Sequence, residues 1–189
     1  MPRAALKVLL AVIFLLAAAL GCQDPPAKLD PDQAKFKALV EKALARQSKA
    51  VTPLLAQAKP GPAVRAYLDH VFQEAIDQGK PFDHDLVVLD SHCTVLGWLG
   101  PDPDDFTQTY QGYVGQNYGH FKKFKPIFQD KRISSFEIYT QYGPGFAICA
   151  PLSKGGKLLG ALCLGYDADT LRKRHGLSGK ELLAIDFNH

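Results

Sequence analysis

Residues 135–166 read SFEIYTQYGPGFAICAPLSKGGKLLGALCLGY, and this stretch decides the fold of the chain. It holds three runs of aliphatic and aromatic residues, separated by two short turn-forming pairs. The runs are Ser135–Tyr142, Gly145–Leu152 and Lys157–Tyr166, and the pairs are Gly143-Pro144 and Gly155-Gly156. Runs of this length with such tight connections predict three consecutive antiparallel strands.

A hairpin precedes this meander. Leu86–Leu89 is a continuous aliphatic run, and Asp90-Ser91-His92 supplies residues that are favoured in turns. We expect the run from Cys93 to Leu99 to form the second strand of the hairpin, which Gly100-Pro101-Asp102-Pro103 then ends. The predicted sheet therefore has five strands.

Two long helices are predicted before the hairpin. Apolar residues recur at helical spacing over 36–47 and again over 64–76, where Gly79 is well placed as the C-terminal stop. Pro53 and the cluster Lys59-Pro60-Gly61-Pro62 interrupt the pattern between them.

Short helices are predicted elsewhere. Residues 101–130 are rich in aromatic side chains but broken by glycines, which indicates short helices and loops. After the meander, Asp167 can cap a helix ending near Gly176, and Ser178 to Glu181 forms a capping box. The order predicts an α+β fold: a central five-stranded antiparallel sheet with long N-terminal and short C-terminal helices.

The composition is that of a packed domain. Of 189 residues 47% are hydrophobic, 22 are basic and 19 acidic, and 4 are cysteines. Removing Arg3 and Lys7, which belong to the leader described next, leaves 20 basic against 19 acidic residues. This excludes a disordered chain and a small disulfide scaffold, and it gives no electrostatic case for nucleic acid as a partner.

The N-terminus reads as an export signal. Val8–Leu20 is an apolar run of 13 residues, too short to span a bilayer as an ordinary helix. It ends at Gly21-Cys22 before a polar, proline-rich stretch, which resembles a bacterial lipobox. That resemblance implies lipidation of Cys22. The expected organisation is a signal peptide over 1–21, a lipidated tether over 22–30 and one domain over 31–189.

Lipidation implies a place in the bacterial cell envelope. Buried acyl methylenes contribute about 0.8 kcal/mol each, so a multiply acylated cysteine holds a protein on a membrane. Gln23, by resemblance to other lipoproteins, indicates the outer membrane and a domain that faces the periplasm. The alternative is a plain secretory signal with an incidental Cys22, which predicts no palmitate or other acyl chain.

Three cysteines remain in the domain: Cys93, Cys149 and Cys163. At most one intrachain disulfide fits. Cys149 and Cys163 flank the Gly155-Gly156 turn, but a two-residue turn places Cys149 opposite Leu162, which disfavours their bond. A register one residue away permits it. We expect all three cysteines to be buried, reduced thiols. If a disulfide forms, it joins Cys149 and Cys163.

Both hairpins resemble those of a known family. LVVLD at 86–90 followed by VLG at 95–97, and AICAPL at 147–152 followed by KLLGAL at 157–162, are similar to the hairpins of the extracytoplasmic Cache family. Asp167 matches an acidic residue that often closes the last hairpin. The resemblance covers residues 32–170 and implies a PAS-like sensor domain that binds a ligand. Such sensors usually precede a transmembrane helix and a signalling domain, whereas this sequence ends at 189 with neither, which argues against direct transmembrane signalling.

The same resemblance places the ligand between the sheet and the segment after the second strand. The candidate ligand-binding residues are Trp98, Tyr110, Tyr113, Tyr118, His120, Tyr139 and Asp167. Aromatic faces attract cations and apolar groups, and the carboxylate of Asp167 suits an amine. The alternative for each aromatic residue is a core role, and for Asp167 that of a helix cap.

No motif indicates catalysis, so we expect no enzyme. The six histidines lack metal-ligand spacing, and no nucleophile motif occurs. Related sensors can carry a non-covalent haem, for which His92 or His120 is a conceivable ligand, but surface histidines are the simpler interpretation, and we expect no cofactor or metal.

Two functions remain. The first is a lipid-anchored domain that binds a small molecule and passes its bound state to a protein partner. The second is an envelope assembly protein that acts through protein contacts without a ligand. The long N-terminal helix makes a homodimer plausible in either case.

Overall fold

The computed structural model describes residues 28–79, 84–100, 112–140 and 143–188. Its elements are α2 (Pro31–Leu55), α3 (Pro60–Asp77), β1 (Asp85–Asp90), β2 (Val95–Leu99), η1 (Lys122–Phe124), α4 (Lys125–Phe128), β3 (Ser134–Thr140), β4 (Gly143–Lys154), β5 (Lys157–Asp167), α5 (Ala168–His175) and α6 (Gly179–Leu183). The strands form one five-stranded sheet of order β2-β1-β5-β4-β3, and every neighbouring pair is antiparallel. The predicted α+β fold is confirmed.

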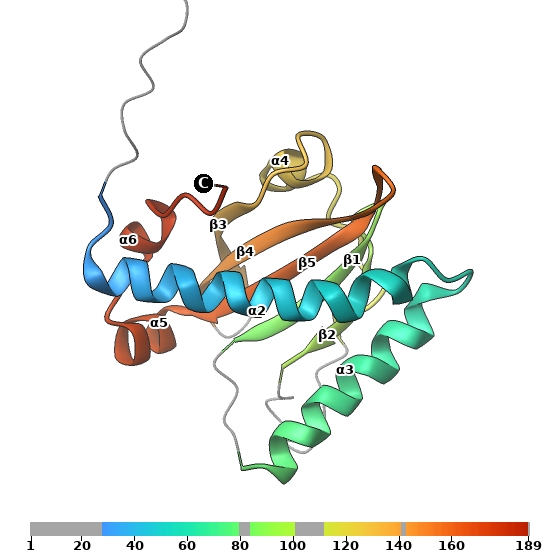
Figure 1. Ribbon diagram of the computed structural model, residues 1–189, viewed down its shortest axis with the longest axis horizontal. Coiled ribbons are helices and arrows are strands. Elements are labelled where there is room, and N and C mark those ends of the chain that lie inside the picture. The colour runs from blue at the N-terminus through green and yellow to red at the C-terminus, as the bar shows by residue number, and fades with distance from the viewer. Residues whose placement is uncertain (1–27, 80–83, 101–111, 141–142, 189) are drawn as a thin grey trace, which may run out of the picture.

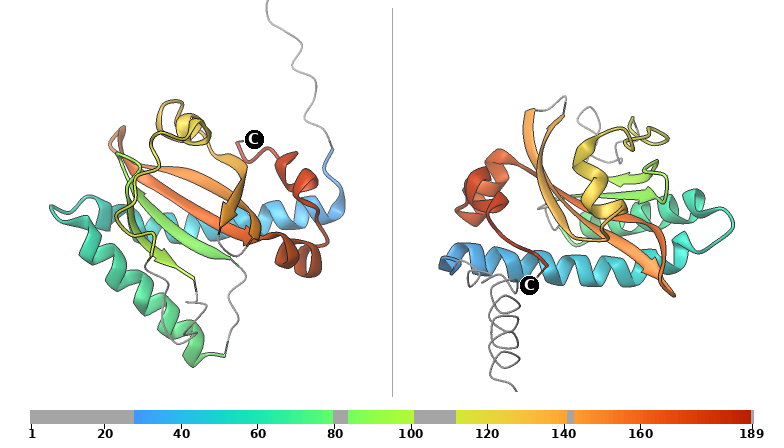
Figure 2. Two further views of the ribbon diagram at one scale, coloured as in Figure 1. Left: turned by 180° about the vertical axis from the view of Figure 1, so that it is seen from behind. Right: turned by 90° about the horizontal axis from the view of Figure 1, so that it is seen from above.

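The sheet separates two layers of helix (Figure 1). The long helix α2 crosses one face of the sheet, and α3 lies beside it against β2. Figure 2 shows η1 and α4 on the opposite face. The helices α5 and α6 sit at the end of the sheet where α2 begins.

Local sequence signals account for the helix ends. Asp30 accepts a hydrogen bond from the backbone N–H of Gln33 at 2.8 Å, and the side chain of Gln33 accepts one from the N–H of Asp30 at 3.1 Å. This capping box starts α2. The predicted interruption at Pro53 is wrong, because Pro53 lies within the last turn of α2. The predicted glycine stops are correct: Gly79 and Gly176 follow α3 and α5 with φ of 61° and 70°.

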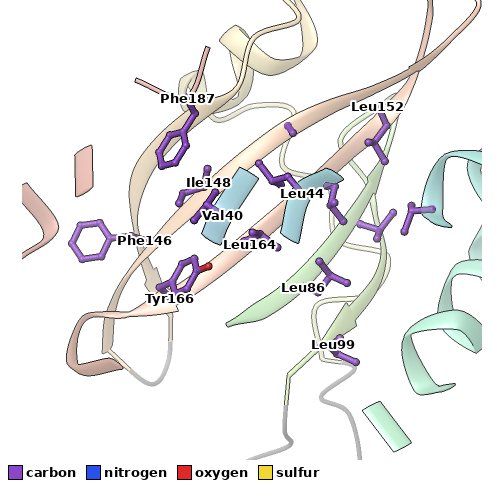
Figure 3. Close-up of a cluster of buried hydrophobic side chains, with 14 of the residues drawn as sticks. Val40, Leu44, Leu86, Leu99, Phe146, Ile148, Leu152, Leu164, Tyr166 and Phe187 are labelled. Carbon is purple, nitrogen blue, oxygen red and sulfur yellow. The ribbon is translucent and has the colours of Figure 1, made fainter. Parts of the chain in front are cut away.

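The first hydrophobic core lies between the sheet and α2 and α3 (Figure 3). Every third or fourth residue of α2 is buried: Phe36, Val40, Leu44, Gln47, Val51 and Leu55. They pack on alternate residues of the central strands, among them Ile148 of β4 and Leu164 of β5, both fully buried. Alternate residues of a strand share one face, and every third or fourth residue of a helix shares one side. One face of the sheet and one side of α2 are therefore buried against each other.

A second, smaller core covers the other face of the sheet. It contains the intervening residues of the strands and one residue of α4: Leu89, Val95, Phe136, Ala147, Cys149, Ala161, Cys163 and Ile127. Phe124 and Phe128 pack around it. Because β5 carries apolar side chains on both faces, it reads as a continuous apolar run rather than as an alternating one.

Both edges of the sheet are protected. At β3, the side-chain amide of Asn188 donates to the carbonyl oxygen of Ile133 at 3.0 Å and accepts from its N–H at 2.9 Å, and Lys123 donates to the carbonyl oxygen of Glu137. At β2, the N–H of Val95 donates to the carbonyl oxygen of Gln116 at 2.9 Å. These contacts occupy backbone groups that would otherwise pair with another strand.

Two predicted strand ends differ in the structure. Cys93 does not belong to β2; it lies in the β1–β2 turn with φ of 63°. Asp90 holds this turn, because its carboxylate accepts hydrogen bonds from the N–H groups of His92 and Thr94 at 2.8 and 2.9 Å. The predicted turn at Gly143-Pro144 is also wrong, because both residues belong to β4.

The register between β4 and β5 shifts by one residue. The hairpin begins as expected, with Lys154 paired to Lys157, but Leu152 pairs with Gly160 rather than with Leu159. One extra residue on β5 therefore faces β4, which is a β-bulge. Every pair beyond this point is displaced by one position from the expectation of a regular two-residue turn.

The displaced register places Cys149 opposite Cys163. The two residues form a disulfide, with their Cα atoms 4.0 Å apart. The predicted pairing of Cys149 with Leu162 is wrong, and so is the expectation that these thiols are reduced, because the bulge supplies the one-residue shift that the bond requires. Within the described residues, Cys93 is a buried free thiol.

We expect reduction of the disulfide to lower the free energy of unfolding by about 2–3 kcal/mol, because the bond closes a loop across a sequence separation of 14 residues. Urea unfolding with and without dithiothreitol measures the effect. The double variant Cys149→Ala/Cys163→Ala loses the response to reductant, whereas Cys93→Ala keeps it. If the urea midpoint of the wild type is the same with and without dithiothreitol, the prediction is contradicted.

Candidate functional site

The candidate site lies on the sheet face opposite α2, where β1 begins and β2 ends. Trp98 of β2 pairs with Val87 of β1, and Asp85 stands two residues before Val87 on the same face. The indole N–H of Trp98 donates a hydrogen bond to the carboxylate of Asp85. Sequence analysis missed Asp85, which precedes the aliphatic run of β1.

Two glycines let the carboxylate and the indole approach each other. A Cβ atom on Gly100 would lie 2.6 Å from Oδ1 of Asp85 and 2.8 Å from Nε1 of Trp98. On the next strand, Gly165 pairs with Asp85, and a Cβ atom there would lie 3.3 Å from the Cβ of Asp85. A side chain at either position would displace these groups. Because Asp85, Gly100 and Gly165 come from segments distant in sequence, no local pattern marks this arrangement.

Tyr113 closes one side of this site. Its ring stacks on the indole of Trp98, with ring centroids 4.5 Å apart and planes inclined by 20°. Both side chains are half-buried. Stacked aromatic rings of this kind present a face with negative electrostatic potential, to which cations are attracted.

Asp167 is the second carboxylate near the site. It ends β5, two residues after Gly165, and its Oδ1 accepts a hydrogen bond from the N–H of Thr170 at 2.7 Å, which caps α5. The helix-cap alternative for Asp167 is therefore correct. The negative charge of Asp167 also raises the pKa of Asp85.

The two carboxylates have opposite pKa shifts. Burial raises the pKa of Asp85 from 3.8 to about 6; the hydrogen bond from Trp98 lowers it, and the negative charge of Asp167 raises it further. Burial also raises the pKa of Asp167, but its hydrogen bonds to Thr170 and neighbouring backbone groups outweigh burial, so that this pKa lies below its ordinary value. Of the two carboxylates, Asp85 is therefore the one whose negative charge the surrounding groups stabilise less.

The ion pairs among the described residues lie elsewhere. Their acidic members are Glu41 and Asp169. Within this part of the chain, neither Asp85 nor Asp167 has a cationic side chain within ion-pair distance. The site is thus a half-buried acidic position beside two stacked aromatic rings.

The other predicted ligand residues do not gather here. Tyr118 packs in the second core and stacks on Phe124 at 6.1 Å. His120 is exposed, with its ring against Phe121 at 4.0 Å. Tyr139 is 75% exposed and donates a hydrogen bond to the carboxylate of Glu137 at 3.1 Å. Tyr110 and Cys22 lie outside the described residues.

The described residues include neither a candidate metal centre nor a helix that could span a membrane. In these ranges, His, Cys, Asp and Glu side chains do not gather into a group of three that could hold a metal ion. Over the same ranges, no helix has the length and the apolar character needed to cross a bilayer.

No family model matches the chain, and no curated protein matches it. Among solved structures, an extracellular ligand binding receptor from Desulfohalobium retbaense has a TM-score of 0.50 at 15% identity, over 74% of this chain and 24% of the receptor. The sensor domain of the V. cholerae histidine kinase DctB has a TM-score of 0.43 at 12% identity, over 75% of this chain and 55% of that domain. The domain of a putative sensory box/GGDEF family protein from Vibrio parahaemolyticus has a TM-score of 0.45 at 14% identity, over 79% of this chain and 63% of that protein.

These comparisons concern the fold. The chain spans about a quarter of the receptor, and less than two thirds of the other two structures. The α+β arrangement of helices and antiparallel sheet is similar to a part of an extracellular ligand binding receptor.

We expect Asp85→Asn to stabilise the protein at neutral pH. Because the folded-state pKa of Asp85 is raised to about 6, its carboxyl group costs no stability below about pH 4, where it is neutral in both states. The cost develops as the pH rises from about 4 to about 6, to at most about 3 kcal/mol. Asparagine keeps the acceptor for Trp98 but carries no charge.

Urea unfolding at about pH 4 and about pH 7.5 tests this. Asp85→Asn should exceed the wild type in stability at the higher pH and match it at the lower. The exposed Asp130 provides the matched control, since Asp130→Asn removes the same charge away from the site. An Asp85→Asn variant without any gain at the higher pH would contradict the raised pKa.

Proposed function

We propose that this domain binds a small organic cation, such as an amine, at Asp85, Trp98 and Tyr113. The observation that supports this most directly is the carboxylate of Asp85, which is held at a half-buried position with its pKa raised to about 6. A cation beside it would remove the unfavourable interaction with Asp167 and favour the ionised form. Binding would therefore release a proton near pH 6.

Aromatic side chains complement this charge. The stacked pair Trp98 and Tyr113 offers an apolar face to the carbon skeleton of an amine and a cation-π contact to its charged group. A carboxylate ligand would instead meet two negative charges, Asp85 and Asp167, without a neighbouring cationic side chain among the described residues. The proposed specificity is thus for cations over anions of similar size.

The bound state would reach a partner through α5. Asp167 interacts electrostatically with Asp85 and also caps the first turn of α5. A ligand cation shared between the two carboxylates would compete with the cap for the same oxygens, which alters the start of that helix. The receptor with the similar fold is described as extracellular and ligand binding, which agrees with this sensor-like role.

Thermal unfolding with a panel of alkyl amines and quaternary ammonium compounds tests the proposed ligand class. At about 100 times the Kd, a bound cation stabilises by about 2.7 kcal/mol, which raises the Tm by roughly 5 °C or more. Carboxylates with the same carbon skeletons provide the anionic comparison and should leave the Tm unchanged.

Two variants locate the binding. Asp85→Asn should abolish the rise in Tm although the variant itself is stable, and Trp98→Leu should weaken it. Asp130→Asn serves again as the control of equal charge and should respond as the wild type does. The proposal fails if no cation stabilises the protein, or if the response persists in Asp85→Asn. Stabilisation by carboxylates alone would also contradict it.

We also propose that a lipid on Cys22 holds the domain in the cell envelope, on the strength of the lipobox-like residues before it. The helix α2 starts at Pro31, nine residues later, so its start would lie within about 32 Å of the membrane surface.

Metabolic labelling with palmitate in a bacterial host tests the anchor. The wild-type chain should incorporate label and sediment with membranes, because acyl chains anchor stably. Cys22→Ala should lose both properties, whereas Cys93→Ala should keep them. An unlabelled wild type supports the plain secretory signal, and label that survives in Cys22→Ala disproves acylation at this residue.

A further inference from the structure

A cluster of positive charge covers the layer of η1 and α4. It consists of five exposed basic side chains: Lys122, Lys123, Lys125, Lys131 and Arg132. We call this the basic face. The acidic residues among them are Asp130 and Glu137, which leaves a net charge of about +3 by side-chain count.

The basic face extends to the β4–β5 turn at one end of the sheet. The Nζ of Lys131 donates a hydrogen bond to the carbonyl oxygen of Gly156 at 3.0 Å, which joins the end of the α4 segment to this turn. Lys154 and Lys157 flank the turn and pair with each other, but they continue the alternation that points Leu152 toward α2 and so lie on the other side of the sheet. The helix α4 packs on the second core through the buried side chain of Ile127. The backbone that carries the lysines is therefore held in place against the sheet.

Within the part of the chain that the structure describes, the cations of the basic face do not form ion pairs. The ion pairs among the described residues are on α2 and α5, and none includes a residue of the basic face. Lys123 and Lys131 contact carbonyl oxygens instead. Like charges gathered without acidic partners repel one another, and an external anionic surface relieves that repulsion.

The residue types favour a membrane over a protein as that surface. Four of the five cations are lysines. Lysine is depleted in protein interfaces, where arginine and buried aromatic anchors dominate, but it is favoured where charge attraction is diffuse. Beside the lysines, Phe121 is 47% exposed and Tyr139 is 75% exposed. Lysine together with exposed aromatic rings is the combination found at the headgroup level of membranes.

We infer that the basic face docks on an anionic phospholipid surface. The headgroup phosphates would lie against the lysines of η1 and α4, with Phe121 at the level of the headgroups. The helices α2 and α3 would then face away from the bilayer, because they cover the other side of the sheet (Figure 2). This inference involves neither Asp85 nor the lipid on Cys22, so it stands or falls separately from the proposed function.

Vesicle flotation of the full chain with Cys22→Ala tests the inference, since this chain cannot be acylated at that position. Vesicles containing phosphatidylglycerol are compared with vesicles of pure phosphatidylcholine. Any binding by residues 1–27 is common to all variants, so the comparison of the variants below separates it from binding by the basic face. We expect stronger binding to the anionic vesicles, and we expect added salt to abolish the difference.

Two triple variants place the effect on the molecule. Lys122→Glu, Lys125→Glu and Arg132→Glu reverse three exposed charges of the basic face and should lower the partition onto anionic vesicles by about 100-fold or more. Lys35→Glu, Lys42→Glu and Lys49→Glu change the net charge equally on the exposed side of α2 and should lower it far less. Retention of the disulfide and of the urea midpoint shows that both variants are folded.

Three results would overturn the inference. One is equal binding of the wild-type sequence to both vesicle types. Another is an equal loss in both triple variants, which would mean that net charge rather than the basic face determines binding. The third is binding to soluble poly-glutamate without binding to anionic vesicles, which would assign the face to an acidic protein.

Discussion

The pairing of β4 with β5 is the constraint on which the rest of the structure depends. Its bulge sets which residues face each other for the remaining length of both strands, and Cys149 and Cys163 then fix that register covalently. Gly160 is required at this point, because a Cβ atom there would overlap the carbonyl oxygen of Leu89 on β1. The central strand β5 thus holds its two neighbours at fixed positions, and both hydrophobic cores are built on its alternate residues.

The sequence predicts most of this fold because its elements are strongly periodic. The stripe of α2, the aliphatic runs of β1, β4 and β5, and the capping box before α6 each depend on neighbouring residues. The errors concern properties that are not local. A bulge adds one residue without any change of pattern, so the opposition of Cys149 to Cys163 could not be derived from the turn. Similarly, the positive φ of Cys93 follows from the Asp90 turn and not from its apolar neighbours.

The candidate site was only partly predictable for the same reason. Trp98, Tyr113 and Asp167 were identified by residue type, but Asp85 joins them only because β1 lies between β2 and β5. Tyr118 packs against the second core instead, and His120 and Tyr139 are exposed. A stability argument identifies Asp85 better than residue type does, since a raised pKa marks a charge that the fold itself does not compensate. Proteins retain such costs where a ligand offsets them.

The side of the sheet that η1 and α4 cover therefore carries charges of opposite sign at two places. Toward the start of β1, the sheet face presents the carboxylates of Asp85 and Asp167, whereas the outer surface of η1 and α4 carries the lysines of the basic face. The second core separates them with apolar side chains, which keeps the lysines from neutralising the carboxylates. A cationic ligand and an anionic membrane can thus be attracted by the same small domain at once.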